Sequence, residues 1–183
     1  MISGTLQLLP TPCNKKIKSY EFSVEYLISK NEITLNYHIE RKLLQLFQGL
    51  KNTPNKIVSP FKREDNLWEN NCLEFFLKPD SIGQAYLEFN FSLDGKWNVF
   101  HFDKYREGKK ETTTPLLEKM EFRHLGHESM GKLSINLSSP SPLRLNSPLF
   151  HGSAILYIDK MPCYFHNLPD SQRPPDFHFF HGA

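Results

Sequence analysis

Apolar side chains recur at every second position along two neighbouring stretches of this chain, residues 20–27 and 33–39. A period of two places these side chains on one face of a β-strand, whereas an amphipathic helix needs a period near 3.6. The polar residues 29–32 between the two stretches supply a turn. The pattern therefore predicts an antiparallel hairpin.

The same alternation returns along much of the chain in short segments separated by turn residues. These segments are residues 72–77, 85–93, 96–103, 119–125, 132–137 and 153–159, with edge pieces at 5–9 and 163–166. So many short strands predict an all-β fold, a single antiparallel β-sandwich whose two sheets bury their apolar faces against each other. Residues 41–50 fit either one short amphipathic helix or irregular apolar packing under a sheet.

Composition narrows the functions that we expect. The 183 residues show no internal repeat, so we expect one domain over residues 1–183. The net charge of +2 gives no electrostatic reason to expect nucleic acid as a partner. The sequence has no apolar run of about 18 residues and no secretion signal, so we expect a soluble, cytoplasmic protein that binds no membrane. The 3 cysteines are far apart, which favours free thiols.

The segment from residue 85 to residue 103 carries the most specific local prediction. Asp94 and Gly95 form the dipeptide that a two-residue type I′ turn prefers, and that turn pairs Phe91 with Asn98. One face then holds an apolar set that belongs in the core: Leu87, Phe89, Phe91, Phe100 and Phe102. The opposite face holds a mixed set: Tyr86, Glu88, Asn90, Trp97 and His101.

The mixed face suits a sugar. Pyranose rings have apolar C–H faces that stack on aromatic rings, and their hydroxyl groups need planar polar side chains as hydrogen-bond partners. A solvated sheet surface, with its one tryptophan covered by a loop, explains the same pattern. The pattern on this face therefore leaves a binding role and a purely structural role open.

Five segments of the sequence, taken together, resemble one known family. They read REDNLWENNCLEFFL at 63–77, YLEFNFS at 86–92, WNVF at 97–100, FDKYREG at 102–108 and PDFH at 175–178. This set resembles bacterial DOMON-like proteins with the fold of the type 9 carbohydrate-binding modules. The resemblance implies a jelly-roll-like β-sandwich that binds a ligand and is not an enzyme. In the sugar-binding relatives aromatic plates hold the ligand, and the resemblance makes Trp68 the first plate, with Trp97 and Tyr105 available as the second.

We therefore predict non-catalytic binding of a carbohydrate or similar polyhydroxylated small molecule, an oligosaccharide included, with no cofactor. The predicted ligand-binding residues are Trp68, Trp97, Tyr105, Arg106, Glu88, Asn90 and His101. For Arg106 a structural role is the alternative, in which its guanidinium ties Glu74 or Asp103 to the neighbouring sheet. Asp176 and His178 are expected to fix the C-terminal tail to the sandwich.

Other functions stay open. A haem site, as in some DOMON relatives, needs an axial pair such as Met and His. The candidates are Met120, Met130, Met161, His101 and His166. A metal site would use His178 and His181, and a glycoside-cleaving enzyme would use two carboxylates. The third alternative is a protein-interaction module with no surviving sugar site, although the sequence indicates no protein partner.

Overall fold

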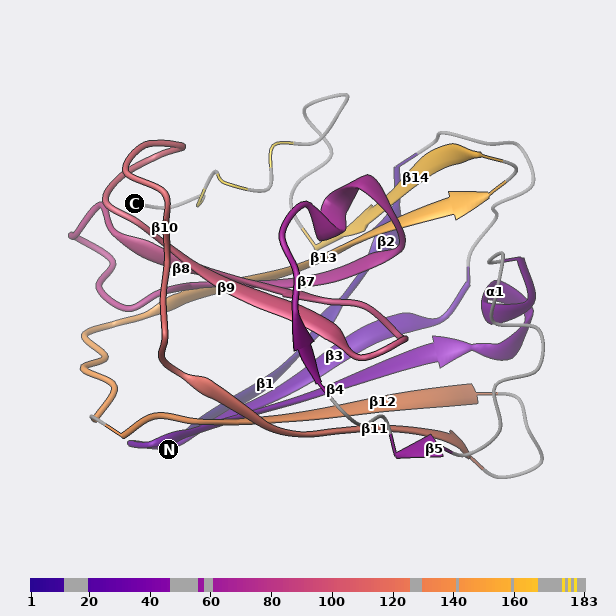
Figure 1. Ribbon diagram of the computed structural model, residues 1–183, viewed down its shortest axis with the longest axis horizontal. Coiled ribbons are helices and arrows are strands. Elements are labelled where there is room, and N and C mark those ends of the chain that lie inside the picture. The colour runs from indigo at the N-terminus through magenta and orange to yellow at the C-terminus, as the bar shows by residue number, and fades with distance from the viewer. Residues whose placement is uncertain are drawn as a thin grey trace.

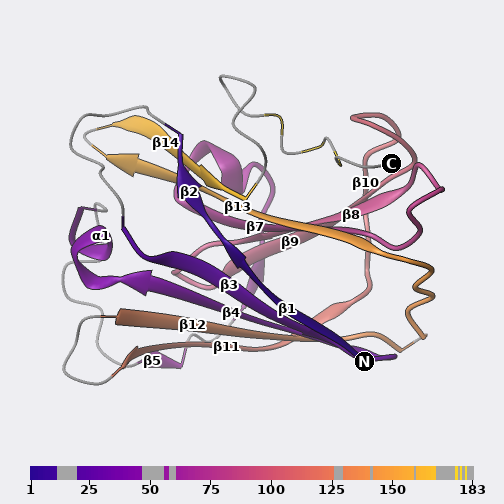
Figure 2. The ribbon, with the colours of Figure 1, turned by 180° about the vertical axis from the view of Figure 1, so that it is seen from behind.

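The computed structural model describes residues 1–11, 20–46, 56–57, 61–125, 130–140, 142–158 and 160–167, together with residues 176, 178 and 180. These residues form two stacked β-sheets, which appear as an upper and a lower layer in Figures 1 and 2. The all-β sandwich expected from the alternation is confirmed.

One sheet has six strands among the described residues. In spatial order they are β1 (Ile2–Gln7), β3 (Phe22–Ile28), β4 (Glu32–Glu40), β12 (Met130–Ser138), β11 (Leu116–Leu125) and β5 (Lys56–Ile57). All neighbours are antiparallel. The predicted first hairpin is the β3–β4 pair, in which Val24 lies opposite Tyr37, and this prediction is confirmed.

The other sheet has eight described strands. In spatial order they are β10 (Lys110–Glu111), β9 (Lys96–Phe102), β8 (Tyr86–Phe91), β7 (Cys72–Lys78), β13 (Leu149–Ile158), β14 (Met161–His166) and β2 (Leu9–Pro10), and β6 (Lys62–Arg63) runs parallel to β9. A short 3₁₀ helix, η1 (Leu67–Glu69), precedes β7. The α-helix α1 (Arg41–Leu46) covers the first part of the predicted helical stretch, and residues 47–50 lie outside the described residues.

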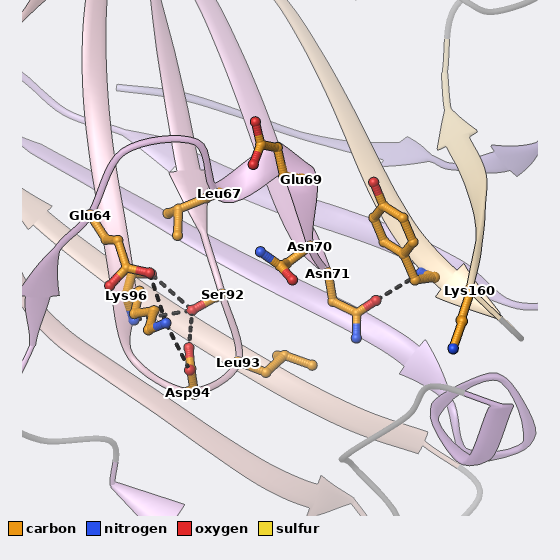
Figure 3. A pocket seen from close by; sticks show the side chains of 11 residues that line it. Glu64, Leu67, Glu69, Asn70, Asn71, Ser92, Leu93, Asp94, Lys96 and Lys160 are labelled. Carbon is orange, nitrogen blue, oxygen red and sulfur yellow. Dashed lines mark hydrogen bonds and ion pairs between the residues drawn. The ribbon is translucent and has the colours of Figure 1, made fainter.

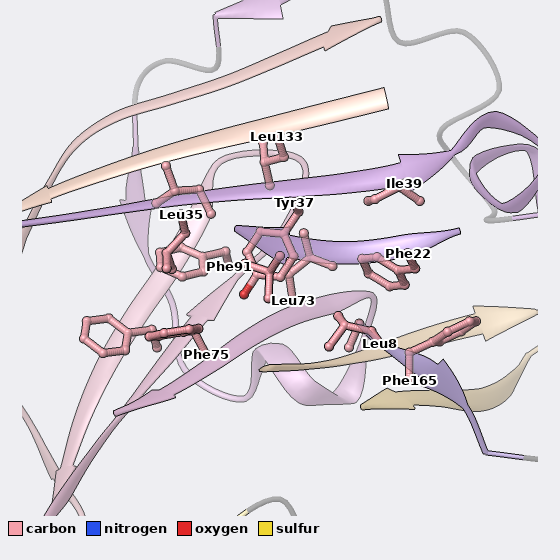
Figure 4. Close-up of a cluster of buried hydrophobic side chains, with 14 of the residues drawn as sticks. Leu8, Phe22, Leu35, Tyr37, Ile39, Leu73, Phe75, Phe91, Leu133 and Phe165 are labelled. Atoms are coloured by element: carbon pink, nitrogen blue, oxygen red, sulfur yellow. The ribbon is translucent and has the colours of Figure 1, made fainter. Parts of the chain in front are cut away.

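The main core fills the space between the two sheets. Figure 4 shows Phe22 and Tyr37 from the six-stranded sheet facing Leu73 and Phe75 from the eight-stranded sheet. The Tyr37 hydroxyl donates a hydrogen bond of 2.8 Å to the backbone carbonyl of Glu74, so the phenol is buried with its polar group satisfied. Packing of alternate side chains from both layers explains why a period of two predicts this fold.

The register predicted for the 85–103 hairpin is wrong by one residue. In the structure Phe91 lies opposite Trp97, because residues 93–95 form a three-residue loop in which Gly95 has φ = 95°. A slip of one residue reverses every side chain of one strand. Trp97 therefore lies in the core between the sheets, while Phe100 and Phe102 lie on the outer face of the eight-stranded sheet.

Candidate functional site

The outer face of the eight-stranded sheet buries polar side chains, which a solvated sheet surface would expose. A transverse row crosses five neighbouring strands, each member lying opposite the next, and no member is more than 4% exposed: Asn98, Asn90, Glu74, Ser153 and His166. Buried polar groups cost free energy unless they are paired, so a row of this kind marks either a hydrogen-bonded network or a ligand site.

Beside this row, the same face carries an apolar cluster. Its buried members are Phe76, Tyr86, Phe100, Phe102 and Ile155, and the partly buried rings of Trp68, Tyr157, Tyr164 and Phe180 pack against them. The face therefore combines aromatic walls with a polar floor.

Glu74 and Glu88 are the acidic groups of this floor. They occupy neighbouring strands in diagonal positions, because Glu74 lies opposite Asn90 and Glu88 lies opposite Phe76. Ser153 donates a hydrogen bond of 2.5 Å to Glu74, and the Asn90 amide donates one of 2.6 Å to Glu88. Both carboxyl groups thus have a neutral donor as their close partner.

Burial raises the pKa of Glu74 to about 8, and the nearby charge of Glu88 acts in the same direction. Burial also raises the pKa of Glu88. The hydrogen bond from Asn90 and the positive charges of Lys109 and Arg106 lower this pKa but do not cancel the effect of burial. Near neutral pH the floor therefore holds a protonated carboxyl group, which both donates and accepts hydrogen bonds.

A pocket of about 440 Å³ opens above this floor, and we call it the Trp68 pocket. It is lined by Trp68, Glu74, Phe76, Glu88, Phe102, Arg106, Lys109, Ile155, Tyr164 and His178. Its volume lies within the range of small-molecule sites, and apolar lining with a few convergent polar groups is typical of such sites.

The helix η1 places Trp68 in the pocket wall. Asn66 before it adopts a left-handed backbone with φ = 58°, a conformation that asparagine tolerates better than most residues. Leu67 is buried, while the Trp68 ring meets the edge of Phe100 at a centroid distance of 6.2 Å. The Lys109 ammonium lies 4.2 Å from the Trp68 centroid and 3.5 Å from the Asp65 carboxylate.

Another part of the lining joins the loop after β9 to the C-terminal residues. The Arg106 guanidinium binds the Asp176 carboxylate at 3.1 Å, and the hydroxyl of Tyr105 hydrogen-bonds to the same carboxylate. The Tyr86 hydroxyl accepts the Arg106 backbone N–H at 3.3 Å and lies 2.7 Å from His178 Nδ1. Burial and the Arg106 charge lower the pKa of His178 to about 4, so its imidazole is neutral near pH 7.

The structure brings together some of the predicted site residues and separates others. Trp68, Glu88 and Arg106 line the Trp68 pocket. Asn90 is fully buried and does not line it, although its amide donates to Glu88. Tyr105 is 49% exposed and does not line the pocket.

Trp97 and His101 lie on the other face of the sheet because of the register slip. The Trp97 ring is 5% exposed, and the Arg63 guanidinium stacks on it at 4.2 Å. His101 lies 3.5 Å from Asp103 at the end of β9. Placing these two side chains on the mixed face was therefore wrong.

Sequence reasoning missed several pocket residues. It offered Arg106 as a partner of Glu74, yet the Glu74 carboxyl group accepts its hydrogen bond from Ser153. It also expected Arg106 to bind Glu74 or Asp103, whereas Arg106 binds Asp176. The signal that could have identified Glu74 is its position opposite Asn90, which becomes visible only once β7 and β8 are paired.

A second, larger pocket of about 620 Å³ lies on the other side of η1, and we call it the Tyr157 pocket. It is lined by Glu64, Leu67, Glu69, Asn70, Asn71, Ser92, Leu93, Asp94, Lys96, Tyr157 and Lys160 (Figure 3). Nothing in the strand alternation predicts this pocket, because its lining comes from loops and strand ends.

The described residues bear on the haem and metal alternatives. Within the described part of the chain, no group of three or more His, Cys, Asp or Glu side chains is placed to hold a metal ion. His181 lies outside the described residues. Met120 is in the core between the sheets, whereas His166 bonds Thr11 on the outer face. None of the described helices has the length and apolar character that a membrane span requires.

Comparison with solved structures gives a likeness over nearly the whole chain. It is to the crystal structure of a proposed carbohydrate-binding protein from Bacteroides uniformis, with a TM-score of 0.60 and 16% sequence identity over 97% of this chain and 82% of that chain. At this identity the likeness shows the fold alone. No protein-family model matches the sequence, and no curated protein matches it either.

Proposed function

We propose that this protein binds a carbohydrate or a similarly polyhydroxylated small molecule in the Trp68 pocket, without catalysing a reaction on it. The observation that carries the proposal is a buried polar floor beside a partly exposed tryptophan. The floor supplies the Glu74 and Glu88 carboxyl groups, and the wall supplies the flat face of Trp68. A sugar needs both, because its ring stacks and its hydroxyls hydrogen-bond.

The protonation state of the floor fits a neutral, hydroxyl-rich ligand. A carboxyl group that keeps its proton near neutral pH both donates to and accepts from a hydroxyl group, and the raised pKa of Glu74 provides such a group. Arg106 adds a further donor to the lining. The fold shared with the proposed carbohydrate-binding protein of Bacteroides uniformis supports this reading, as does the sequence resemblance to the type 9 modules.

A sugar-cleaving enzyme is the second candidate, because two acidic groups share the pocket. Glycosidases place their two carboxylates on opposite sides of the scissile bond. Glu74 and Glu88 instead project from neighbouring strands of one floor, so both would contact the same side of a bound sugar. This arrangement favours binding over hydrolysis.

Calorimetric titration with neutral, acidic and amino sugars tests the proposal. We expect at least one sugar to bind, Trp68→Ala to weaken it by about tenfold or more, and Trp68→Phe to keep part of the affinity, since stacking on an aromatic ring is a major contribution. Asn136→Ala is the matched control, because Asn136 is exposed on the six-stranded sheet. No binding across the panel would refute the proposal, and release of free sugar from a bound glycoside would favour the enzyme.

A further inference from the structure

The Trp68 pocket and the Tyr157 pocket are neighbours on one face of the sheet. The helix η1 separates them, since Trp68 lines one pocket while Leu67 and Glu69 line the other. Strand β13 contributes to the lining of both, with Ile155 in the first and Tyr157 in the second. Two residues along a strand advance about 6.6 Å on one face. That advance is on the scale of the distance between adjacent rings in a glycan.

The Tyr157 pocket repeats the chemistry of the Trp68 pocket. Tyr157 presents a partly buried aromatic ring that packs against the same apolar cluster as Trp68. Asn71 accepts the Tyr157 backbone N–H at 2.7 Å through its Oδ1, which leaves its Nδ2 as a donor. The Asn70 side chain is exposed, and Figure 3 shows it between Leu67 and Asn71 with no bond to the other residues drawn.

The charges at the hairpin end of the Tyr157 pocket neutralise one another. Lys96 binds Glu64 at 2.8 Å and lies 3.8 Å from Asp94, and the Ser92 hydroxyl donates to Asp94 (Figure 3). Lys62 binds the same Glu64 carboxylate at 3.1 Å, so two lysines face two carboxylates and this end has no surplus charge to select an ionic ligand. The free amide groups and the tyrosine ring instead fit a neutral, hydroxylated one.

We infer that the two pockets are consecutive subsites for one oligosaccharide, with one sugar unit against Trp68 and a following unit against Tyr157 beyond η1. This inference rests on the proposed function and specifies its ligand as a glycan chain rather than a free monosaccharide. The Tyr157 pocket then supplies affinity that depends on the length of the glycan.

Calorimetry with glycans of increasing length tests the inference. The probes are glucose, xylose, mannose, galactose and N-acetylglucosamine, each as the monosaccharide and as the β-1,4-linked di-, tri- and tetrasaccharide. For the series that binds, we expect affinity to rise at least tenfold from the monosaccharide to the trisaccharide. Tyr157→Ala should abolish this rise while changing monosaccharide affinity by less than twofold. Asn70→Ala, an exposed substitution, should reduce the rise by about threefold.

The outcomes separate the inference from the proposed function. Trp68→Ala should weaken binding at every length, and Asn136→Ala should change it at none. Equal affinity for the monosaccharide and the trisaccharide would overturn the inference and leave the proposed function standing. A rise that persists in both Tyr157→Ala and Asn70→Ala would also overturn it. Absence of binding by every probe would refute the two together.

Discussion

Lys109 holds its ammonium nitrogen 4.2 Å from the centroid of the Trp68 ring. The same nitrogen lies 3.8 Å from the Phe100 centroid. Each ring attracts the cation through its quadrupole. We therefore expect the lysine to compete with a stacked ligand for contact with the Trp68 ring. A side chain of the protein itself thus already contacts the ring on which the proposed ligand would stack.

Removing this competitor should strengthen sugar binding. A cation–π contact at an exposed site contributes about 0.5–1 kcal/mol, so Lys109→Ala should raise monosaccharide affinity by about two- to fivefold. Lys104→Ala is the matched control, because Lys104 lies in the same loop and pairs with Glu107. Calorimetry measures both variants. Weaker binding by Lys109→Ala would show instead that the ammonium donates to the ligand.

Stability should fall as the pH rises from 6.5 to 8.5. The folded-state pKa of Glu74 is about 8 against an ordinary value of 4.5, so the folded protein binds more protons than the unfolded chain across that range. His178 acts in the opposite sense, because its pKa is lowered from 6.5 to about 4, but its contribution ends near pH 6.5. Above that pH the two floor carboxyl groups determine how stability depends on pH. Glu74 alone should lower the free energy of unfolding by at most about 2 kcal/mol between pH 6.5 and 8.5.

Urea denaturation at pH 6.5, 7.5 and 8.5 measures this dependence. Glu74→Gln should flatten it, since glutamine keeps the shape of the side chain but cannot ionise. Glu107→Gln, a substitution at the exposed partner of Lys104, should keep the wild-type slope. If Glu74→Gln and the wild type lose the same stability between pH 6.5 and 8.5, ionisation of the buried Glu74 is not the cause of the pH dependence.

Period-two alternation was sufficient to predict the sandwich. Strands such as β3 and β4 each have one apolar face, and a second sheet is needed to bury it. The β8–β9 register could not be predicted in the same way. Asp94-Gly95 fits a two-residue turn and equally fits the last two positions of a three-residue loop whose final residue has positive φ. Both faces of these strands are buried, so the hydrophobic pattern does not choose between the two registers.

The sequence predicted only part of the candidate site. Trp68 was identified by the residues around it, and Glu88 by its strand. Lys109 and His178 come from a loop and from the C-terminal residues, which carry no periodic signal. They meet Glu88 only through tertiary folding, 90 positions separating His178 from it in the chain.

The observed register predicts different consequences for the two tryptophans. Trp97 is 5% exposed in the core between the sheets, so Trp97→Ala should lower the free energy of unfolding by about 3–5 kcal/mol. Trp68 is only partly buried, so Trp68→Ala should cost less than about 2 kcal/mol. Urea denaturation compares them. Similar costs for the two variants would contradict this register, because they would mean that both rings are equally buried.

Gly152 sets the spacing between the two sheets where β13 faces β3. A Cβ atom at this position would lie 2.8 Å from Val24 Cγ1 and 3.3 Å from Leu8 Cδ2, closer than packed carbon atoms allow. Gly152→Ala should therefore lower the free energy of unfolding by about 1–3 kcal/mol, the usual cost of overpacking.

Gly83→Ala is the matched control, because its new Cβ meets Asp80 Cβ at 3.4 Å, and its effect should stay within about 0.5 kcal/mol. The close contact also predicts coupling with Val24. Combining Gly152→Ala with Val24→Ala should destabilise the protein by at least about 1 kcal/mol less than the sum of the single variants, since each relieves the strain of the other. Additive costs in urea denaturation would mean that β13 and β3 are not packed against each other at this point.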